Sequence, residues 1–261
     1  MSYNNSIFGF RYENVKEFIK IMNAVKILDI CTVHGNGEGL SICGLTSDHV
    51  IYCDVNLKKN MFQNLIFNSK EKDVTFGLKI NTFCTYLSKL ISMKFIDVCL
   101  TNTDEIHLST EYISYIIKLL DIQENPLGEL TFNSSSPSCA IEFVVDIKIF
   151  REAINSLLGE EIQFAFKQDK EKTLNLTSHD VTGSSSIILT DKTASGLQFC
   201  KFQENCFKYN FQKIETIFKY IFSNSVNVLF RYDGILKCRH YLLPDGYIDF
   251  VLAPQIEIKN E

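Results

Sequence analysis

The sequence predicts an α+β protein in which one fold, made of antiparallel sheets and two helices, is used twice. Three observations lead to this class. Most of the chain has the pattern of short strands, only four segments have a helical period, and these segments recur at a nearly constant spacing. At 261 residues the chain is long enough for two domains with a core each.

Short apolar runs, either alternating with polar residues or unbroken, predict the strands. They lie at Leu40–Cys43, His49–Val55, Val74–Ile80, Phe95–Leu100, Tyr112–Leu119, Ile162–Phe166, Ile187–Thr190, Val226–Tyr232 and Tyr247–Leu252. Turn residues separate the strands, as in the segments Gly35–Gly39, Gln168–Lys172, Asp233–Gly234 and Pro244–Gly246. Gly and Asn adopt positive φ and Asp closes a turn on its own backbone, so these segments predict hairpins and antiparallel sheets.

Four segments carry apolar residues at every third or fourth position, which is typical of amphipathic helices. They are Asn14–Lys26, Asn81–Lys94, Asp146–Leu158 and Asn210–Phe222. In the second segment the apolar face consists of Phe83, Cys84, Leu87, Leu90 and Ile91. Asn14 and Asp146 are suited to cap the first and third helices, and Gly159 is suited to stop the third.

The helices repeat along the chain. Asn14, Val15 and Phe18 lie 132 residues before Asp146, Ile147 and Phe150. At a spacing of 131, Leu45-Thr46-Ser47 precedes Leu176-Thr177-Ser178, and Ile80, Phe83, Leu87 and Ile91 precede Phe211, Ile214, Phe218 and Phe222. Any two amphipathic helices can be aligned, but three matches in the same order predict a duplicated fold.

The repeat predicts an N-terminal domain at 1–119 and a C-terminal domain at 139–261. The connector between them, at 120–138, contains two of the four prolines and the run Ser134–Ser136. Such a composition is typical of an interdomain segment. The connector is either a strap lying on the surface or a simple tether.

The composition is that of an ordinary globular chain, with 46% hydrophobic and 22% charged residues. Apolar runs such as Tyr115–Leu120 end after a few residues, whereas a membrane span needs about 20. We therefore expect neither disorder nor a membrane protein. Nine cysteines are an odd number, and the first residues lack the pattern of a secretion signal, so we expect a reducing compartment.

The net charge of −5 argues against nucleic acid, whose usual binders are basic. The distribution of the charge reverses this interpretation. The four helical segments hold four acidic and nine basic residues, a net of +5, which leaves −10 for the rest of the chain; the basic residues are Lys16, Lys20, Lys26, Lys89, Lys94, Lys148, Arg151, Lys213 and Lys219.

On the first and third helices the basic residues fall on a stripe opposite the apolar residues. The two stripes consist of Lys16, Lys20 and Asn23, and of Lys148, Arg151 and Asn155. Helices that dock their apolar faces on sheets would present such stripes together. That surface would attract phosphates through counterion release without reading bases. The alternative is a solvated helix face with no ligand.

Catalytic and metal sites have little support in the sequence. The cysteines form no C-x-x-C pair and the histidines no H-x₃₋₅-H pair, so a structural zinc site is not expected. Cys238 and His240 alternate on a predicted strand without a third group to orient them. Gly35, Gly37 and Gly39 are not followed by a helix, and Asp169-Lys170-Glu171 lies in a predicted turn. We therefore predict no enzymatic activity, no metal and no cofactor.

Several short motifs, together with the duplication, resemble the sliding-clamp family, whose fold is that of proliferating cell nuclear antigen. The tail Phe250–Glu257 is close to the tail motif of that family, and Leu45–Val50 resembles the strand entry that carries a central histidine. Four further motifs resemble the Rad-one subunit of the heterotrimeric nine-one-one checkpoint clamp: Glu13–Lys16, Met61–Gln63, Phe76–Asn81 and Phe150–Ala153.

The resemblance implies a crescent whose helices line a channel around duplex DNA, with three crescents closing a ring. The channel residues would be Lys16, Lys20, Lys26, Lys89, Lys148, Arg151, Lys213 and Lys219. The ring contact would pair Tyr112–Leu119 with Ser185–Thr190 of a neighbour, through Tyr112, Ile113, Tyr115, Ile116, Ser185, Ile187 and Ile188. An apolar edge strand left unpaired would aggregate, so joining subunits is also expected on physical grounds.

The resemblance also implies partner proteins. Docking peptides of repair or checkpoint proteins would bind a pocket formed by Leu45, His49, Val50, Phe250, Leu252 and Pro254, although ordinary packing would account for these residues too. The implied function is a nuclear checkpoint-clamp subunit, joined by two other clamp-fold subunits and placed on DNA by a clamp loader. The alternatives are a homotrimeric processivity clamp for DNA polymerase and a 3′–5′ DNA exonuclease.

Overall fold

The computed structural model describes residues 6–70, 72–101, 104–121, 135–181, 183–191 and 196–255. The chain divides into two compact units. The first unit comprises Met1–Leu127 and Leu242–Ile248, and the second comprises Gly128–Tyr241 and Asp249–Glu261. None of the helices within the described ranges is long and apolar enough to cross a membrane.

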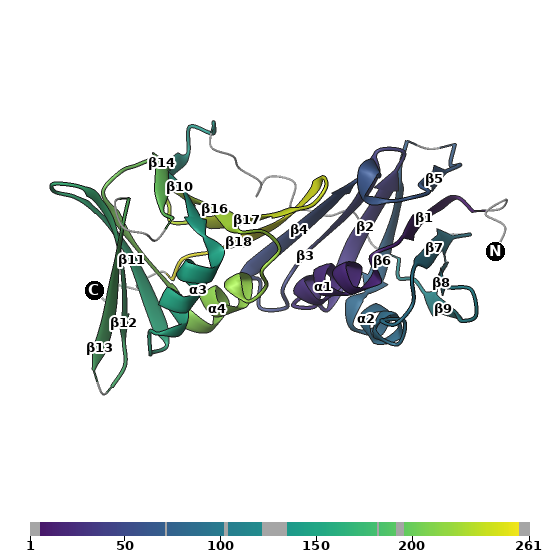
Figure 1. Cartoon of the computed structure of the whole chain (residues 1–261), viewed down its shortest axis with the longest axis horizontal. Coiled ribbons are helices and arrows are strands. Elements are labelled where there is room, and N and C mark those ends of the chain that lie inside the picture. Colours follow the sequence, from purple (N-terminus) through teal and green to yellow (C-terminus); the bar gives the residue numbers. More distant parts are fainter. Residues whose placement is uncertain are drawn as a thin grey trace. The chain divides into compact units, whose positions relative to one another are not determined.

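The first unit contains nine strands, two α-helices and one short 3₁₀ helix among its described residues (Figure 1). In chain order these are β1 (Phe8–Tyr12), α1 (Val15–Val25), β2 (Ile30–Asn36), β3 (Gly39–Leu45), β4 (Ile51–Lys58), η2 (Lys59–Met61), β5 (Ile66–Phe67), β6 (Val74–Lys79), α2 (Ile80–Ser88), β7 (Ile96–Leu100), β8 (Glu105–Ser109) and β9 (Ser114–Lys118).

The second unit repeats this order from the next strand onward. Its elements are β10 (Cys139–Asp146), α3 (Ile147–Asn155), β11 (Glu161–Gln168), β12 (Lys172–His179), β13 (Ser184–Thr190), β14 (Gln198–Lys201), β15 (Asn205–Asn210), α4 (Phe211–Phe218), β16 (Ser225–Arg231), β17 (Leu236–Leu242) and β18 (Gly246–Leu252). The last strand begins in the residues of the first unit and continues into the second.

The order of strands in the sheets confirms the duplicated α+β fold. In the first unit the strands run in the orders β5-β1-β7-β8-β9 and β4-β3-β2-β6. In the second unit they run in the orders β14-β10-β16-β17-β18 and β13-β12-β11-β15. Adding nine to each strand number of the first unit gives the second. Every pairing whose register is described is antiparallel, such as β2 with β3 and β11 with β12.

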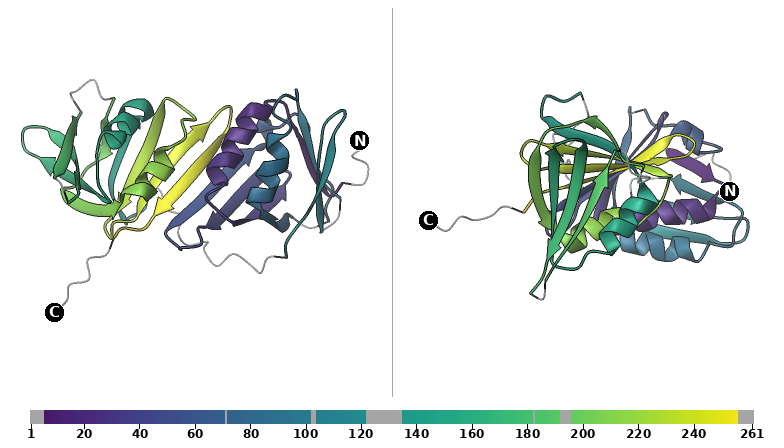
Figure 2. Two further views of the ribbon diagram at one scale, coloured as in Figure 1. Left: turned by 90° about the horizontal axis from the view of Figure 1, so that it is seen from below. Right: turned by 60° about the vertical axis from the view of Figure 1, so that its left-hand side comes forward.

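Each unit packs its two helices side by side (Figure 2). Aromatic side chains form the core beneath them. In the first unit the Phe18 ring of α1 lies 5.9 Å from Phe10 of β1 and 6.5 Å from Phe83 of α2. In the second unit Phe150 of α3 lies 6.1 Å from Phe143 and 4.9 Å from Phe218 of α4. The helical apolar pattern therefore docks the same face of each helix onto its own sheets.

The capping residues expected from the sequence begin their helices. The Asn14 side chain accepts a hydrogen bond from the Glu17 N–H, and the Asp146 carboxylate accepts from the Lys148 and Ile149 N–H groups. Such bonds satisfy donors that the first helical turn leaves unpaired. Gly159 has φ 145°, and a Cβ there would lie 2.5 Å from the His179 carbonyl oxygen, so no side chain fits after the third helix.

The second helix is shorter than its apolar pattern predicts. It ends at Ser88, and turns with bonds of the i to i−3 type follow, from Leu90 N–H to the Leu87 carbonyl and from Met93 N–H to the Leu90 carbonyl. The tighter turn changes the direction of successive side chains. As a result, Leu90 is buried but Ile91, expected on the apolar face, is 49% exposed. The fourth helix likewise ends at Phe218, before Phe222.

Two strand predictions are wrong at their first residues. His49 and Val50 lie in a turn before β4, where His49 has φ 59° and the Asp48 carboxylate accepts bonds from the Thr46 hydroxyl and the Val50 N–H. Tyr112 and Ile113 also precede their strand, because both N–H groups donate to the Thr110 hydroxyl in the β8–β9 turn. Local side-chain acceptors thus compete with the sheet ladder at these points.

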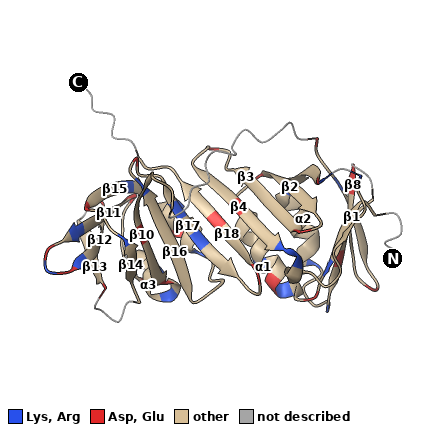
Figure 3. Cartoon of the chain, turned by 90° about the horizontal axis from the view of Figure 1, so that it is seen from above, with Lys and Arg blue, Asp and Glu red and all other residues tan. Residues whose placement is uncertain are grey.

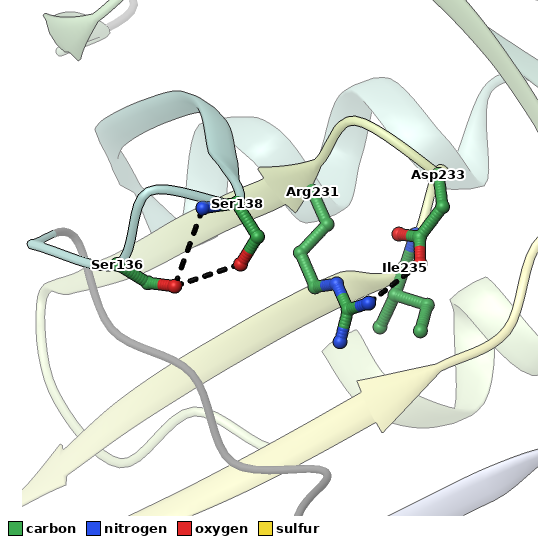
Figure 4. A network of polar contacts seen from close by, with 5 residues as sticks. All are labelled: Ser136, Ser138, Arg231, Asp233 and Ile235. Carbon is green, nitrogen blue, oxygen red and sulfur yellow. Dashed lines mark hydrogen bonds and ion pairs between the residues drawn. The ribbon is translucent and has the colours of Figure 1, made fainter.

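The predicted domain limits remain a prediction, since residues 122–134 of the connector lie outside the described residues. Before that segment, Leu120 exchanges two backbone hydrogen bonds of 2.9 Å with Gly77 of β6. After it, the Ser136 and Ser138 hydroxyls lie 2.7 Å apart at the start of β10, near the turn in which Arg231 pairs with Asp233 (Figure 4). The sequence pattern does not predict that Leu242–Ile248 belongs to the first unit.

Candidate nucleic-acid interface

Helix α1 presents two lysines on the face opposite its core residues. Val15, Phe18 and Met22 are buried, whereas Lys16 and Lys20 are exposed. Figure 3 marks the basic and acidic positions on the ribbon of α1 in blue and red. Residues four apart are neighbours on a helix surface, so the two ammonium groups share one stripe. The nearby Glu17 carboxylate accepts a bond of 3.0 Å from the Asn14 amide, and burial raises the pKa of Glu17.

Two more lysines of the predicted set end the helices of the first unit. Lys26 follows α1 and Lys89 follows α2, and both are exposed. The Lys89 ammonium lies 5.3 Å from the centre of the Tyr86 ring and 5.8 Å from that of Tyr115 on β9. This cation–π arrangement holds Lys89 where the helix face meets the edge of the sheet.

In the second unit two of the four predicted basic residues, Arg151 and Lys219, line a groove between α3 and α4. Lys148 and Lys219 are exposed, and Arg151 and Lys213 are half-buried. The groove has a volume of about 510 Å³ and is lined by Arg151, Ile154, Asn155, Gln212, Glu215, Thr216, Phe218 and Lys219. Each unit thus brings its own predicted channel residues onto the exposed side of its two helices.

The residues predicted to join subunits lie on or beside strands at sheet edges. Strand β9 ends one sheet of the first unit, and β13 ends one sheet of the second. Ile116 on β9 is 56% exposed and Ile188 on β13 is 61% exposed. Tyr115 faces Tyr86 at a ring distance of 4.8 Å, and Ser185 accepts a bond of 3.2 Å from the Leu158 N–H.

The residues of the predicted peptide pocket have unequal exposure. In the first unit His49 is exposed, and Leu45 and Val50 are half-buried beside it. In the second unit Phe250 and Leu252 are each only 1% exposed. Phe250 packs edge-on to the His240 ring at 5.8 Å. The Phe250 ring and the Leu252 side chain therefore belong to the core of the second unit. Of the predicted pocket residues in this unit, Pro254 is half-buried.

The thiol and imidazole that alternate on β17 face the core and do not form a nucleophilic pair. Burial raises the pKa of the Cys238 thiol well above its ordinary value, so the thiol is protonated at neutral pH. Burial also lowers the pKa of His240 to about 4, and its Nε2 lies 3.1 Å from the Ile217 carbonyl oxygen. Within the described ranges, no three His, Cys, Asp or Glu side chains are grouped so as to hold a metal.

One basic residue of this surface is missing from the sequence analysis. Lys79 is exposed and occupies the N-cap position of α2, directly before the buried Ile80. The predicted helix began two residues later, at Asn81, and therefore left Lys79 out. Ile80 is one of the apolar helix residues that recur in the repeat. A helix predicted to begin at Ile80 would have placed Lys79 at its N-cap.

Comparison with known proteins agrees with the fold. No family model matches the chain. The chain is 22% identical over 253 residues to the probable DNA polymerase sliding clamp 2 of Paramecium bursaria Chlorella virus 1, which covers 94% of this chain and 88% of the relative. It is 22% identical over 262 residues to the DNA polymerase sliding clamp of Thermococcus fumicolans, covering 96% and 99% of the two chains.

The solved structures point in the same direction. The crystal structure of proliferating cellular nuclear antigen from Entamoeba histolytica matches with a TM-score of 0.78 at 13% identity, over 96% of this chain and 100% of the other. The match extends over both units, and the nine-strand repeat within this chain agrees with it. The chain therefore has the duplicated fold of the sliding clamps.

Proposed function

We propose that this chain is a non-enzymatic subunit of a ring that encloses duplex DNA and tethers other proteins to it. The observation that carries the proposal is the segregation of charge. A chain of net charge −5 places exposed lysines on or directly beside all four helices, and these helices belong to a sliding-clamp fold. The acidic remainder would repel DNA and leave the helix faces as its place of contact.

The chemistry of these faces suits a protein that moves along DNA. Lysine contacts to phosphates gain affinity from counterion release and carry no sequence information. A ring held by such contacts can slide, because each position on the duplex offers the same phosphates. Specific contacts to base edges would stop it at preferred sites.

The edge strands support closure of a ring through subunit contacts. In the first unit, the edge of β4 is next to the turn before β18, where the Lys58 N–H donates to the Asp245 carbonyl at 3.1 Å. The strand that corresponds to β4 in the repeat is β13, and the strand that corresponds to β18 is β9. Pairing β9 of one subunit with β13 of the next would cover the exposed Ile116 and Ile188.

Within this function we propose a subunit of a heterotrimeric checkpoint clamp acting in the nucleus, since the motifs around Glu13–Lys16 and Phe76–Asn81 resemble the Rad-one subunit. Its partners would be two other clamp-fold chains, a clamp loader, and repair or checkpoint proteins with docking peptides. The second candidate is a homotrimeric processivity clamp for DNA polymerase, and it is suggested by the names of the curated relatives, which are DNA polymerase sliding clamps. A nuclease is not proposed.

Charge reversal tests the enclosure of DNA. The variant combines Lys16→Glu, Lys20→Glu, Lys148→Glu and Lys213→Glu, and its binding to a fluorescent duplex is followed by anisotropy over a range of salt concentrations. We expect weaker binding and a shallower dependence on salt. Unchanged binding at every salt concentration would contradict the assignment of the helix faces.

The mass of the purified chain in solution separates the two kinds of ring. A homotrimeric clamp would give one species near three times 30.0 kDa. A subunit of a heterotrimer should remain at the mass of one chain and join a larger species only when other clamp-fold chains are added. Light scattering with and without these chains distinguishes the cases.

A further inference from the structure

We propose that the two units share the contact with duplex DNA unequally, the first unit binding phosphates and the second offering a nearly neutral polar surface. This inference rests on the proposed function, but it concerns which half of the chain supplies the affinity. It is carried by the charges of the helices with their capping residues, by the spacing of those charges, and by the lining of the α3–α4 groove.

The helices of the two units differ in net charge. Helices α1 and α2 with their caps carry one acidic residue, Glu17, and five lysines, a net of +4; the lysines are Lys16, Lys20, Lys26, Lys79 and Lys89. Helices α3 and α4 with their caps carry three acidic and four basic residues, a net of +1; these are Asp146, Glu152 and Glu215 with Lys148, Arg151, Lys213 and Lys219. All five lysines of the first unit are exposed.

The spacing of the charges adds to this difference. On α3, Glu152 follows Lys148 by four residues, and on α4, Glu215 precedes Lys219 by four, so a carboxylate is a surface neighbour of Lys148 and of Lys219. On α1, Lys16 and Lys20 are themselves four apart, and the one carboxylate of this helix, Glu17, lies beside Lys20 and interacts with it. Like charges at this spacing destabilise an isolated helix. A surface that keeps this repulsion is suited to a polyanion that relieves it.

The groove of the second unit contains its own anion. Arg151 and Lys219 line it together with the exposed carboxylate of Glu215. A phosphate that entered would meet this carboxylate as well as the two cations. The neighbouring Asn155, Gln212 and Thr216 are uncharged and can hydrogen-bond to a phosphate, either directly or through water. Such a lining permits contact with DNA that releases few counterions.

Three matched double variants of the full chain test the inference by anisotropy with a linear fluorescent duplex. The first removes two lysines from the first unit, Lys16→Gln with Lys20→Gln. The second removes two from the second unit, Lys148→Gln with Lys219→Gln. The third removes the acidic neighbours, Glu152→Gln with Glu215→Gln. Light scattering confirms that all proteins have the same mass in solution, and circular dichroism confirms that they are folded.

We expect the first variant to bind about tenfold more weakly near 0.1 M salt, with the slope of log affinity against log salt reduced by about 2. The second should lose less than about threefold, with a slope reduced by less than about 1. The third should bind more tightly than the natural chain, a gain that misfolding would not produce.

The outcomes separate this inference from the proposed function. Equal losses in the first and second variants, or no gain in the third, would overturn the unequal sharing and leave the DNA-enclosing role in place. Binding that none of the variants alters at any salt concentration would overturn both.

Discussion

Each unit contains one arginine that pairs with an aspartate through two hydrogen bonds, and the two pairs differ in their surroundings. In the first unit Arg11 of β1 binds Asp97 of β7 with two bonds of 2.8 Å. In the second, Arg239 of β17 binds Asp249 of β18 at 2.7 and 2.6 Å. Asp249 also pairs with the Lys237 ammonium at 2.9 Å, and the Lys237 and Asp249 side chains are both under 5% exposed.

The repeat shows that the fold does not require this charged cluster. In the first unit Val98 of β7 is paired with Leu108 of β8, and in the second unit Val228 of β16 is paired with Cys238 of β17. The repeat therefore aligns His107 with Lys237. It likewise aligns Ser109 with Arg239. His107 faces Ile116, which is 56% exposed on the edge strand β9. The same hairpin is thus an open edge in one unit and the site of a buried ion cluster in the other.

The largest expected effect comes from removing the shared carboxylate of the cluster. Asp249→Ala would remove the carboxylate that lies 2.9 Å from the buried Lys237 ammonium, and breaking a buried pair in this way costs about 3 to 5 kcal/mol. The free energy of unfolding in urea measures the loss. The matched control is Asp97→Ala, where the more exposed Arg11 regains water and the loss should be about 1 to 2 kcal/mol. Equal losses would show that Lys237 adds nothing to the difference.

A smaller effect should appear on acidification, again through the second unit. The pKa of His240 is lowered by burial to about 4, so an unfolded chain binds a proton there that the folded chain does not. The stabilisation is complete above about pH 6.5 and is lost as the pH falls toward 4, by up to about 3 kcal/mol.

The variant His240→Phe checks this assignment. Its free energy of unfolding should fall less between pH 7 and pH 4 than that of the natural chain. The three histidines of the first unit, His34, His49 and His107, all retain exposure and provide no such burial. A pH profile identical to that of the natural chain would exclude His240 as the cause.

The smallest effect on stability, with the largest on assembly, is expected at the open edges. Ile116→Lys and Ile188→Lys alter exposed side chains, so each should change the free energy of unfolding by no more than about 0.5 kcal/mol. Each would place a charge in the proposed subunit contact and should abolish association at that edge, measured by light scattering with the other clamp-fold chains added. Ile30→Lys is the control, because Ile30 is 49% exposed on β2, inside its sheet. Association that survives both edge changes would contradict the contact.

The sequence predicted the repeat and its helices because apolar spacing and capping are local properties. Asn14 and Asp146 cap as expected, and the core of each unit uses the predicted phenylalanines Phe18 and Phe150. The errors lie where a local contact ends an element. The 3₁₀-type turns after Ser88 expose Ile91, and the Asp48 carboxylate keeps His49 out of its strand. Periodicity alone contains no information about such bonds.

The difference in net charge between the helices and the remainder of the chain could be predicted from the sequence, because a helix fixes which side chains share a face. Three features depended on the tertiary structure. It placed β9 and β13 at sheet edges, it buried Phe250 and Leu252, and it gathered Lys237, Arg239 and Asp249 into one cluster. Each of these three features depends on contacts between different strands. Strand order and burial are set by packing between segments that lie far apart in the sequence, so the residue pattern of one segment does not predict them.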